Sequence, residues 1–278
     1  MTPLKLVAVI LIAALAYWLY QRKARATRLQ QLATQQLDPD LLELMRQHMP
    51  LYERLPPDLQ LRLQGLVNVF INDKNFFGSD GLKITDAMRL AVAGNACLLI
   101  LGRDDPRFPG SATILIYPDT IVAPQKHQDG AVVHEGASAR LGESWRRGPV
   151  ILSWADVLRG NQNPDDGQNV VLHEFAHKLD EENETMDGLP VLRDHADYAE
   201  WARVMTQEFA ELTERVQRRN NRVIDSYAST SPVEFFAVVT EVFFEQGKTM
   251  QRKLPSLYEQ LSKYYGVNTA AWKEYGHH

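Results

Sequence analysis

The sequence predicts an α+β fold that is mainly helical and contains a small β-sheet. Apolar residues recur at helical spacing through most of the chain, whereas three short segments between residues 112 and 154 are rich in β-branched residues and bounded by Pro, Gly and Asp. A helix predicted over residues 170–180 follows these strands and carries two histidines on one face. With 278 residues, 45% of them hydrophobic, the chain is long enough to bury a sizeable core.

The chain begins with an apolar run over residues 6–20 that ends in aromatic residues and is followed by basic ones. The run is a little shorter than the roughly 17 to 25 residues that span a bilayer, but Leu4 extends it. Because more positive charge follows the run than precedes it, the sequence predicts a single-pass membrane anchor with a basic flank over residues 1–25, and a cytoplasmic location for the rest of the chain. There are two alternatives: a cleaved signal peptide, although its charges lie on the wrong side, and a soluble helix that packs on the domain.

Residues 26–50 are predicted to form a helical linker, within which Asp38 and Pro39 mark the start of a helix. A single domain is predicted over residues 51–270. Its expected elements, in order, are a helix at 58–71, a loop at 78–81, a helix at 85–101, strands at 112–117, 131–134 and 149–154, a loop at 161–167, and helices at 170–180, 194–219 and 231–244.

Charge and cysteine content exclude several classes of protein. The net charge is −5 and no basic face runs through the chain, so no nucleic-acid partner is expected. Cys97 is the single cysteine, which excludes a disulfide within the chain and a cysteine-rich zinc site. Because it lies in an apolar run, we expect a buried thiol, which fits a reducing compartment.

The helix at 170–180 reads V-V-L-H-E-F-A-H-K-L-D and predicts a metal site. Residues four apart lie one above the other on a helix, so His173 and His177 can reach one Zn²⁺ while Glu174 lies beside the open coordination position, as in peptidases. Asp180 falls on the histidine side, where its carboxylate can hold an imidazole N–H. The alternative is that these residues match the spacing by accident on a polar surface helix.

A catalytic zinc usually takes a third protein ligand, and the best candidate region is the apolar helix at 231–244. Glu234 and Glu241 share one face of that helix, and a buried carboxylate needs a partner such as a metal. Glu234 can equally close a capping box with Ser231, and Glu241 is the second choice for the metal or for support of a ligand. Tyr227 lies close enough to donate a hydrogen bond to an oxyanion, or is simply a core tyrosine.

Several motifs together resemble one family of proteins. The segments H-E-F-A-H-K-L-D at 173–180 and D-S-Y-A-S-T-S-P-V-E-F-F-A-V-V-T-E-V-F-F at 225–244 are similar to those of the MtfA family (Mlc titration factor A), zinc-dependent peptidases of bacteria. The resemblance extends to I-T-D-A-M-R at 84–89, L-I-Y-P at 115–118 and G-E-S-W-R-R-G-P-V-I-L-S-W at 142–154. It covers residues from about 50 to 265, and the N-terminal anchor departs from the family's better-known soluble members.

The resemblance implies a role for each candidate residue and a fold. It implies that the metal ligands are His173, His177 and Glu234. It also implies that Glu174 and Tyr227 are catalytic residues, and that His134 is a histidine that can approach the metal. A plain histidine at a strand end is the alternative for the last of these. The implied fold is zincin-like, with the small sheet packed over the metal helix, and is similar to the catalytic domain of anthrax lethal factor.

The function expected from these observations is zinc-dependent hydrolysis of a peptide or protein substrate, with Glu174 as the general base. The alternative is a zinc-containing regulatory protein that binds a transcriptional repressor or another partner with little proteolysis. In that case His134 would close the site as a fourth ligand. A third interpretation, a membrane-bound scaffold without metal, requires the histidine pair to be a coincidence.

Overall fold

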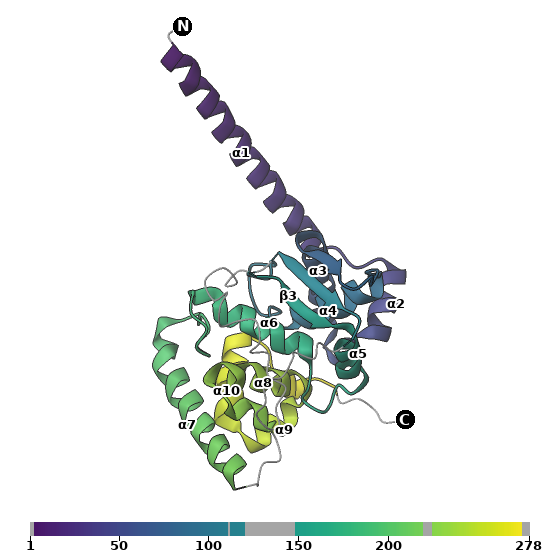
Figure 1. Ribbon diagram of the computed structural model, residues 1–278, viewed down its shortest axis with the longest axis vertical. Coiled ribbons are helices and arrows are strands. Elements are labelled where there is room, and N and C mark those ends of the chain that lie inside the picture. Colours follow the sequence, from purple (N-terminus) through teal and green to yellow (C-terminus); the bar gives the residue numbers. More distant parts are fainter. Residues whose placement is uncertain (1–2, 111, 120–147, 219–223, 274–278) are drawn as a thin grey trace.

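The computed structural model describes residues 3–110, 112–119, 148–218 and 224–273, with side chains from Ile10 onward. The strand predicted at 131–134 lies outside the described residues. Helices dominate the described part of the chain, and a small parallel sheet lies beside them (Figure 1). The predicted α+β architecture is confirmed at this level.

The sheet has the strand order β1-β2-β3, with β1 at Asn75–Gly78, β2 at Thr113–Tyr117 and β3 at Val150–Ser153. Both pairs are parallel, and Phe76 lies opposite Ile114, which in turn lies opposite Val150. The strands predicted at 112–117 and 149–154 are confirmed as β2 and β3. The first strand was not predicted, and Gly78, which was expected in a loop, is its last residue.

The helices begin and end at the following residues: α1 Pro3–Ala33, α2 Pro39–His48, α3 Pro57–Asp73, α4 Asp86–Leu98, α5 Trp154–Gln162, α6 Val170–Asp180, α7 Tyr198–Gln217, α8 Pro232–Glu245, α9 Gly247–Lys253 and α10 Pro255–Tyr265. Short 3-10 helices lie at Pro50–Arg54, Glu181–Asn183, His195–Asp197, Ser226–Ser229 and Thr269–Ala271. The helix predicted at 194–219 therefore consists of a 3-10 turn followed by α7.

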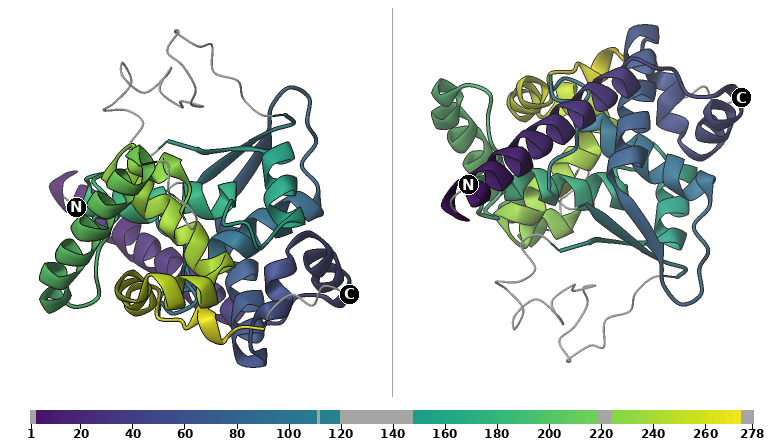
Figure 2. Two further views of the ribbon diagram at one scale, coloured as in Figure 1. Left: turned by 90° about the horizontal axis from the view of Figure 1, so that it is seen from below. Right: turned by 90° about the horizontal axis from the view of Figure 1, so that it is seen from above.

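The helix α8 forms the centre of the described part of the molecule, since every residue from Phe235 to Glu245 is buried. Its start follows from local sequence, because Ser231 accepts a hydrogen bond from the N–H of Glu234 and Pro232 occupies the first helical position. The helix α6 packs along α8 and also contacts α4 and β3 (Figure 2). The metal helix is thus held between the sheet and the core.

The prediction of a membrane anchor at the N-terminus is wrong. In the part of the chain whose side chains are described, no helix combines the length and the apolar character that a membrane span needs. The cytoplasmic placement that was inferred from this anchor loses its support as well.

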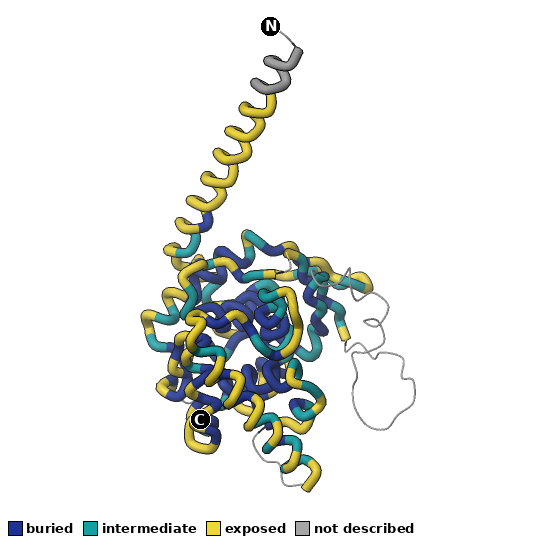
Figure 3. The backbone as a smooth tube through the Cα atoms, turned by 90° about the vertical axis from the view of Figure 1, so that its left-hand side faces the viewer, coloured by how far each residue is buried: buried dark blue, intermediate teal, exposed yellow. Residues whose placement is uncertain are grey.

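Instead, α1 extends from the body of the molecule and is exposed over most of its described length (Figure 3). Its C-terminal end packs on α3: Arg25 pairs with Asp73 at 2.6 Å, and Leu29 is buried. The two helices approach so closely that a Cβ on Gly65 would lie 1.9 Å from the carbonyl oxygen of Ala33. The predicted linker also contains α2, which packs on α4.

Candidate metal centre

Two histidines of α6 meet at their Nε2 atoms. One turn of helix separates His173 from His177, so their rings lie with centroids 4.7 Å apart and nearly perpendicular. The two Nε2 atoms are 3.1 Å apart. Both rings are mostly buried between α6 and α8. A direct contact between two ring nitrogens at this distance suits a shared cation better than it suits one hydrogen bond.

Glu234 on α8 brings a carboxylate oxygen to the same point. Its Oε2 lies 3.0 Å from His173 Nε2 and 3.6 Å from His177 Nε2. Ligand atoms about 2.0–2.1 Å from a tetrahedral Zn²⁺ are roughly 3.3–3.4 Å from one another. The triangle formed by these three atoms therefore has sides close to those of one face of a tetrahedral zinc site. The three residues form a group that can hold a metal ion.

The surroundings of Glu234 also fit a bound cation. Its Oε2 is buried without a hydrogen-bond partner of good geometry, although two imidazole nitrogens lie nearby. Burial raises the pKa of this carboxyl, but contacts with His173 and His177 outweigh burial and hold the pKa well below its usual range. An ionised carboxylate beside two imidazoles is a donor set that zinc prefers.

The structure gives the contacts that bear on the two alternatives for Glu234. Ser231 caps the helix by accepting from the N–H of Glu234, whereas the carboxylate of Glu234 faces the histidines. Only the serine half of the predicted capping box therefore forms.

A second carboxylate supports His173 from the opposite side of its ring. Glu241 Oε1 lies 2.8 Å from His173 Nδ1, and its Oε2 accepts a hydrogen bond from the backbone N–H of Asn169. A carboxylate on Nδ1 fixes the tautomer and leaves Nε2 free to bind a metal. Burial lowers the pKa of His173, but Glu234 and Glu241 together raise it to about 10.

Asp180 does not take the place that was expected for it. Its Oδ2 accepts a hydrogen bond from the N–H of Gly188 at 2.8 Å, and no hydrogen bond joins it to either histidine of α6. Its Oδ1 and the Nδ1 of His177 are both buried without hydrogen-bond partners among the described residues. Burial raises the pKa of Asp180, and the hydrogen bond from Gly188, together with the nearby His177, offsets this in part.

Glu174 and Tyr227 complete the surroundings of the histidines. Glu174 follows His173 on α6, is half-buried, and has a charge that helps to raise the pKa of His173. Tyr227 lies in the 3-10 helix Ser226–Ser229, where its ring centroid is 6.1 Å from that of His173. Both residues therefore lie beside the group of three. His134 lies outside the described residues.

Two residues that hold α6 in place, Asn169 and Glu245, were not predicted from the sequence. Asn169 caps α6 by accepting from the N–H groups of Val171 and Leu172, and its side-chain amide donates to Glu245 at 3.1 Å. Glu245 is buried and also accepts from the N–H of Gly167. The asparagine directly before an apolar helix was a signal for its cap. Nothing local in the sequence indicates the partner of Glu245.

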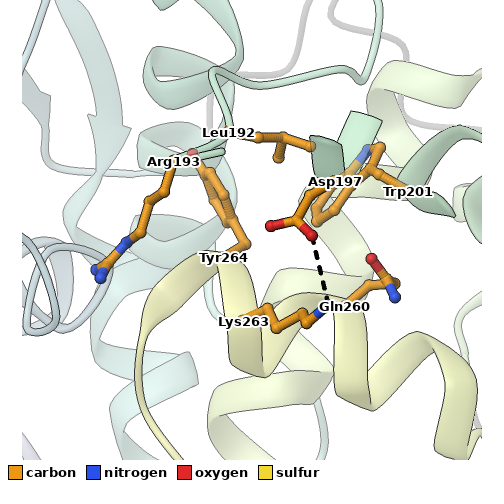
Figure 4. Close-up of a pocket in the computed structure, with 7 residues that line it drawn as sticks. All are labelled: Leu192, Arg193, Asp197, Trp201, Gln260, Lys263 and Tyr264. Atoms are coloured by element: carbon orange, nitrogen blue, oxygen red, sulfur yellow. Dashed lines mark hydrogen bonds and ion pairs between the residues drawn. The ribbon is translucent and has the colours of Figure 1, made fainter. Parts of the chain in front are cut away.

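A separate hollow of about 90 Å³ lies between α7 and α10 (Figure 4). Asp197 and Lys263 face each other in it at 3.4 Å, and Arg193 extends away to bond the carbonyl of Gly102. None of the predicted site residues that the structure describes lines it.

Comparison with known proteins gives consistent matches. The family described as "Glucose-regulated metallo-peptidase M90" matches residues 21–266. A protein of Synechocystis sp. described as uncharacterized is 37% identical over 273 residues, which cover 95% of this chain and 97% of that protein. Two proteins called Mlc titration factor A are each 29% identical to this chain. The match to the one from Escherichia fergusonii covers 79% of this chain and 83% of that protein. The match to the one from Yersinia pestis covers 78% of this chain and 81% of that protein.

Proposed function

Because the chain belongs to the glucose-regulated metallo-peptidase M90 family, we propose that it is a zinc-dependent peptidase that hydrolyses peptide bonds in a peptide or protein substrate. The observation that carries this proposal is the convergence of His173 Nε2, His177 Nε2 and Glu234 Oε2, with Glu174 next to them. In the proposed assignment the first three residues bind the metal and the catalytic domain covers residues 51–270. The proposed fold relationship is to zincins such as the anthrax lethal factor catalytic domain.

Each protein group has a defined task in this proposal. When bound, a divalent ion at the site supplies Lewis-acid chemistry, polarising a carbonyl and making water a stronger nucleophile near neutral pH. The carboxylate of Glu174 accepts the proton of the attacking water and returns it to the leaving amine. Tyr227 donates a hydrogen bond to the oxyanion. Glu241 keeps His173 in the tautomer that presents Nε2.

The test combines metal content with cleavage of a panel of short chromogenic peptides. We expect wild type to contain one zinc and to cleave at least one peptide, and Glu174→Gln to keep the zinc while activity falls by about 100-fold or more. Glu234→Ala is expected to lose both. Glu259→Gln, which changes an exposed glutamate on α10, is the control and should match wild type. A Glu174→Gln variant with full activity would reject the proposed mechanism.

A regulatory role is the second candidate, and the names of the relatives favour it. The proteins called Mlc titration factor A are named for the titration of another factor, and they are 29% identical to this chain. In that role the chain would bind a transcriptional repressor or another protein partner, and His134 would be the fourth ligand of a closed zinc site. Stoichiometric zinc without cleavage of any peptide, together with loss of zinc affinity in His134→Ala, would favour this candidate.

A further inference from the structure

The phenol of Tyr227 is carried by a very short element, the 3-10 helix Ser226–Ser229. This helix packs on α7 and α8, and its residue Ala228 is fully buried. Tyr227 itself is half-buried, with its ring centroid 6.1 Å from that of His173. The direction in which a side chain leaves the backbone is coupled to the local backbone conformation. The placement of this phenol therefore depends on how the peptide groups of Tyr227 are held.

Two polar side chains hold the peptide groups of Tyr227 from the two ends of the 3-10 helix. The Oδ1 atom of Asp225 accepts a hydrogen bond from the N–H of Tyr227 at 2.8 Å. The hydroxyl of Thr230 donates to the carbonyl of Tyr227 at 2.7 Å, and the N–H of Thr230 donates to the same carbonyl at 3.0 Å. Side chains thus bond both the N–H and the carbonyl of this one residue. We refer to Asp225 and Thr230 as the Tyr227 clamp.

Asp225 also adds charge to the surroundings of the metal centre. Burial raises the pKa of Glu241, contacts with His173 and with the N–H of Asn169 lower it, and the charge of Asp225 raises it again. Asp225 therefore lies near the carboxylate that supports His173. A test of Asp225 must separate the loss of this charge from the loss of the hydrogen bond to Tyr227.

We propose that Asp225 and Thr230 are positioning residues that hold the hydroxyl of Tyr227 where it can donate to the oxyanion. This inference rests on the proposed function, because it needs the phenol of Tyr227 to act in the reaction. Both clamp residues act through the peptide groups of Tyr227 and not on the substrate. A displacement of about 1 Å can cost about 100-fold in rate, so a loosened clamp should lower kcat while the metal stays bound.

The alternative is that both side chains only stabilise the 3-10 helix, as a cap does. A purely structural loss acts in the same way whether or not the ring of Tyr227 carries a hydroxyl. A positioning role acts only through that hydroxyl. The two roles therefore give different results in a double-mutant cycle with Tyr227→Phe.

The test measures kcat, KM and zinc content of the full chain for Asp225→Ala, Asp225→Asn, Thr230→Val, Tyr227→Phe and the double variant Asp225→Ala/Tyr227→Phe. Asp225→Asn removes the charge but keeps an oxygen that can accept from the N–H of Tyr227. Ser229→Ala is the matched control, because the hydroxyl of Ser229 lies in the same 3-10 helix but donates to the carbonyl of Ser226 at 2.8 Å. Amide hydrogen exchange of Tyr227, followed by NMR, reports on the clamp without any substrate.

We expect kcat to fall by at least about tenfold in Asp225→Ala and by about threefold in Thr230→Val, with KM and zinc content close to wild type. Asp225→Asn should stay within about threefold of the wild-type kcat, and Ser229→Ala within about twofold. In the Tyr227→Phe background, Asp225→Ala should change kcat by less than about twofold. The N–H of Tyr227 should exchange at least about tenfold faster in Asp225→Ala, and at nearly the wild-type rate in Asp225→Asn.

An unchanged kcat in Asp225→Ala, or the same loss of kcat in the Tyr227→Phe background, overturns the positioning role. An exchange rate of Tyr227 that Asp225→Ala leaves unchanged overturns the clamp itself, whatever the activity. A wild type that cleaves no peptide, or a fully active Tyr227→Phe, contradicts the proposed function, and the positioning role falls with it. The exchange measurement still decides in that case whether the clamp exists, so the two failures are distinguishable.

Discussion

Two carboxylates of α8 contact the same histidine through opposite nitrogens of its ring. Glu234 meets Nε2 of His173 at 3.0 Å, and Glu241 meets Nδ1 at 2.8 Å. The two residues share a face of α8 because seven positions are close to two helical turns. The two contacts differ, because His177 lies beside the Nε2 atom of His173 and not beside its Nδ1 atom. Glu241 is therefore suited to orient His173 rather than to bind the metal.

This division of roles predicts the effect of replacing Glu241 by glutamine. Glu241→Gln removes the charge that polarises His173 but keeps the shape of the side chain. Loss of such a support typically weakens metal affinity by about 10- to 100-fold. We expect this loss in a competition assay with a zinc chelator, while Glu259→Gln on the protein surface binds zinc as wild type does. Equal zinc affinity in Glu241→Gln and wild type would show that Glu241 does not support the site.

Tyr227 allows a second test at the same scale. Tyr227→Phe removes the hydroxyl but retains the ring that lies 6.1 Å from the ring of His173. If the hydroxyl stabilises the oxyanion, kcat should fall by about 100-fold while KM and zinc content stay close to wild type. A core role would instead lower the melting temperature and leave kcat unchanged. Steady-state kinetics together with a thermal melt separate the two roles.

At the scale of elements, the metal helix is positioned mainly by α8. Glu241 accepts from the N–H of Asn169, and Glu245, one turn later on α8, accepts from the side chain of Asn169. Asn169 in turn caps α6. One turn of α8 thus fixes the N-terminus of α6, and with it the position of His173.

The buried carboxyl of Glu245 predicts a pH dependence of stability. Burial raises its pKa to about 8 in the folded chain, above the ordinary glutamate value of 4.5. The folded state therefore binds more protons between these pH values, so the free energy of unfolding falls as pH rises from about 4.5 to 8, by at most about 1.4 kcal/mol per pH unit. Glu245→Gln removes this contribution. We expect the variant to lose less stability than wild type over that range.

The measurement is urea denaturation of both proteins at several pH values between 5 and 9, with a chelator present so that metal binding does not contribute. The free energy of unfolding should depend on pH less steeply in Glu245→Gln than in wild type. Glu259→Gln is the control and should follow wild type throughout. Parallel curves for Glu245→Gln and wild type would mean that Glu245 is ionised in the folded state at neutral pH.

Elements with local signals were predicted well, and elements that depend on distant partners were not. The starts of α2 and α8 follow from Asp38 before Pro39 and from Ser231 before Pro232, which are signals within a few residues. The strand β1 has four residues and is defined by parallel pairing with β2, more than thirty residues later. A parallel partner leaves no local signal, so β1 was missed.

The same distinction applies to the candidate site. The spacing within α6 predicted that His173 and His177 share a face, and the capping pattern predicted where α8 begins. The spacing within α6 also suggested that Asp180 supports an imidazole, whereas Glu241 was only a second choice for the metal or for support of a ligand. The tertiary structure places Glu241 of α8 on His173 and directs Asp180 to Gly188. Which carboxylate supports a histidine depends on contacts between helices, and the periodicity of a single helix does not predict those contacts.

At the scale of the whole molecule, the metal centre joins distant parts of the chain. His177 and Glu234 are separated by α7 and the segment that follows it, and they meet only because α6 packs along α8 in the folded state. The unfolded chain has no such arrangement. A metal ion that binds here therefore binds the folded state selectively, and its binding free energy adds to the free energy of unfolding.

Removal of the metal should accordingly lower the melting temperature of the whole domain. An ion present at about 1,000 times its Kd contributes about 4 kcal/mol, which corresponds to roughly 10 °C for a domain of this size. Differential scanning fluorimetry with zinc and with a chelator measures the shift. Glu234→Ala should melt at the same temperature under both conditions, because one ligand is missing. If wild type also melts at one temperature, the three residues do not bind zinc tightly in the folded chain, and both functions considered for the site would require another explanation.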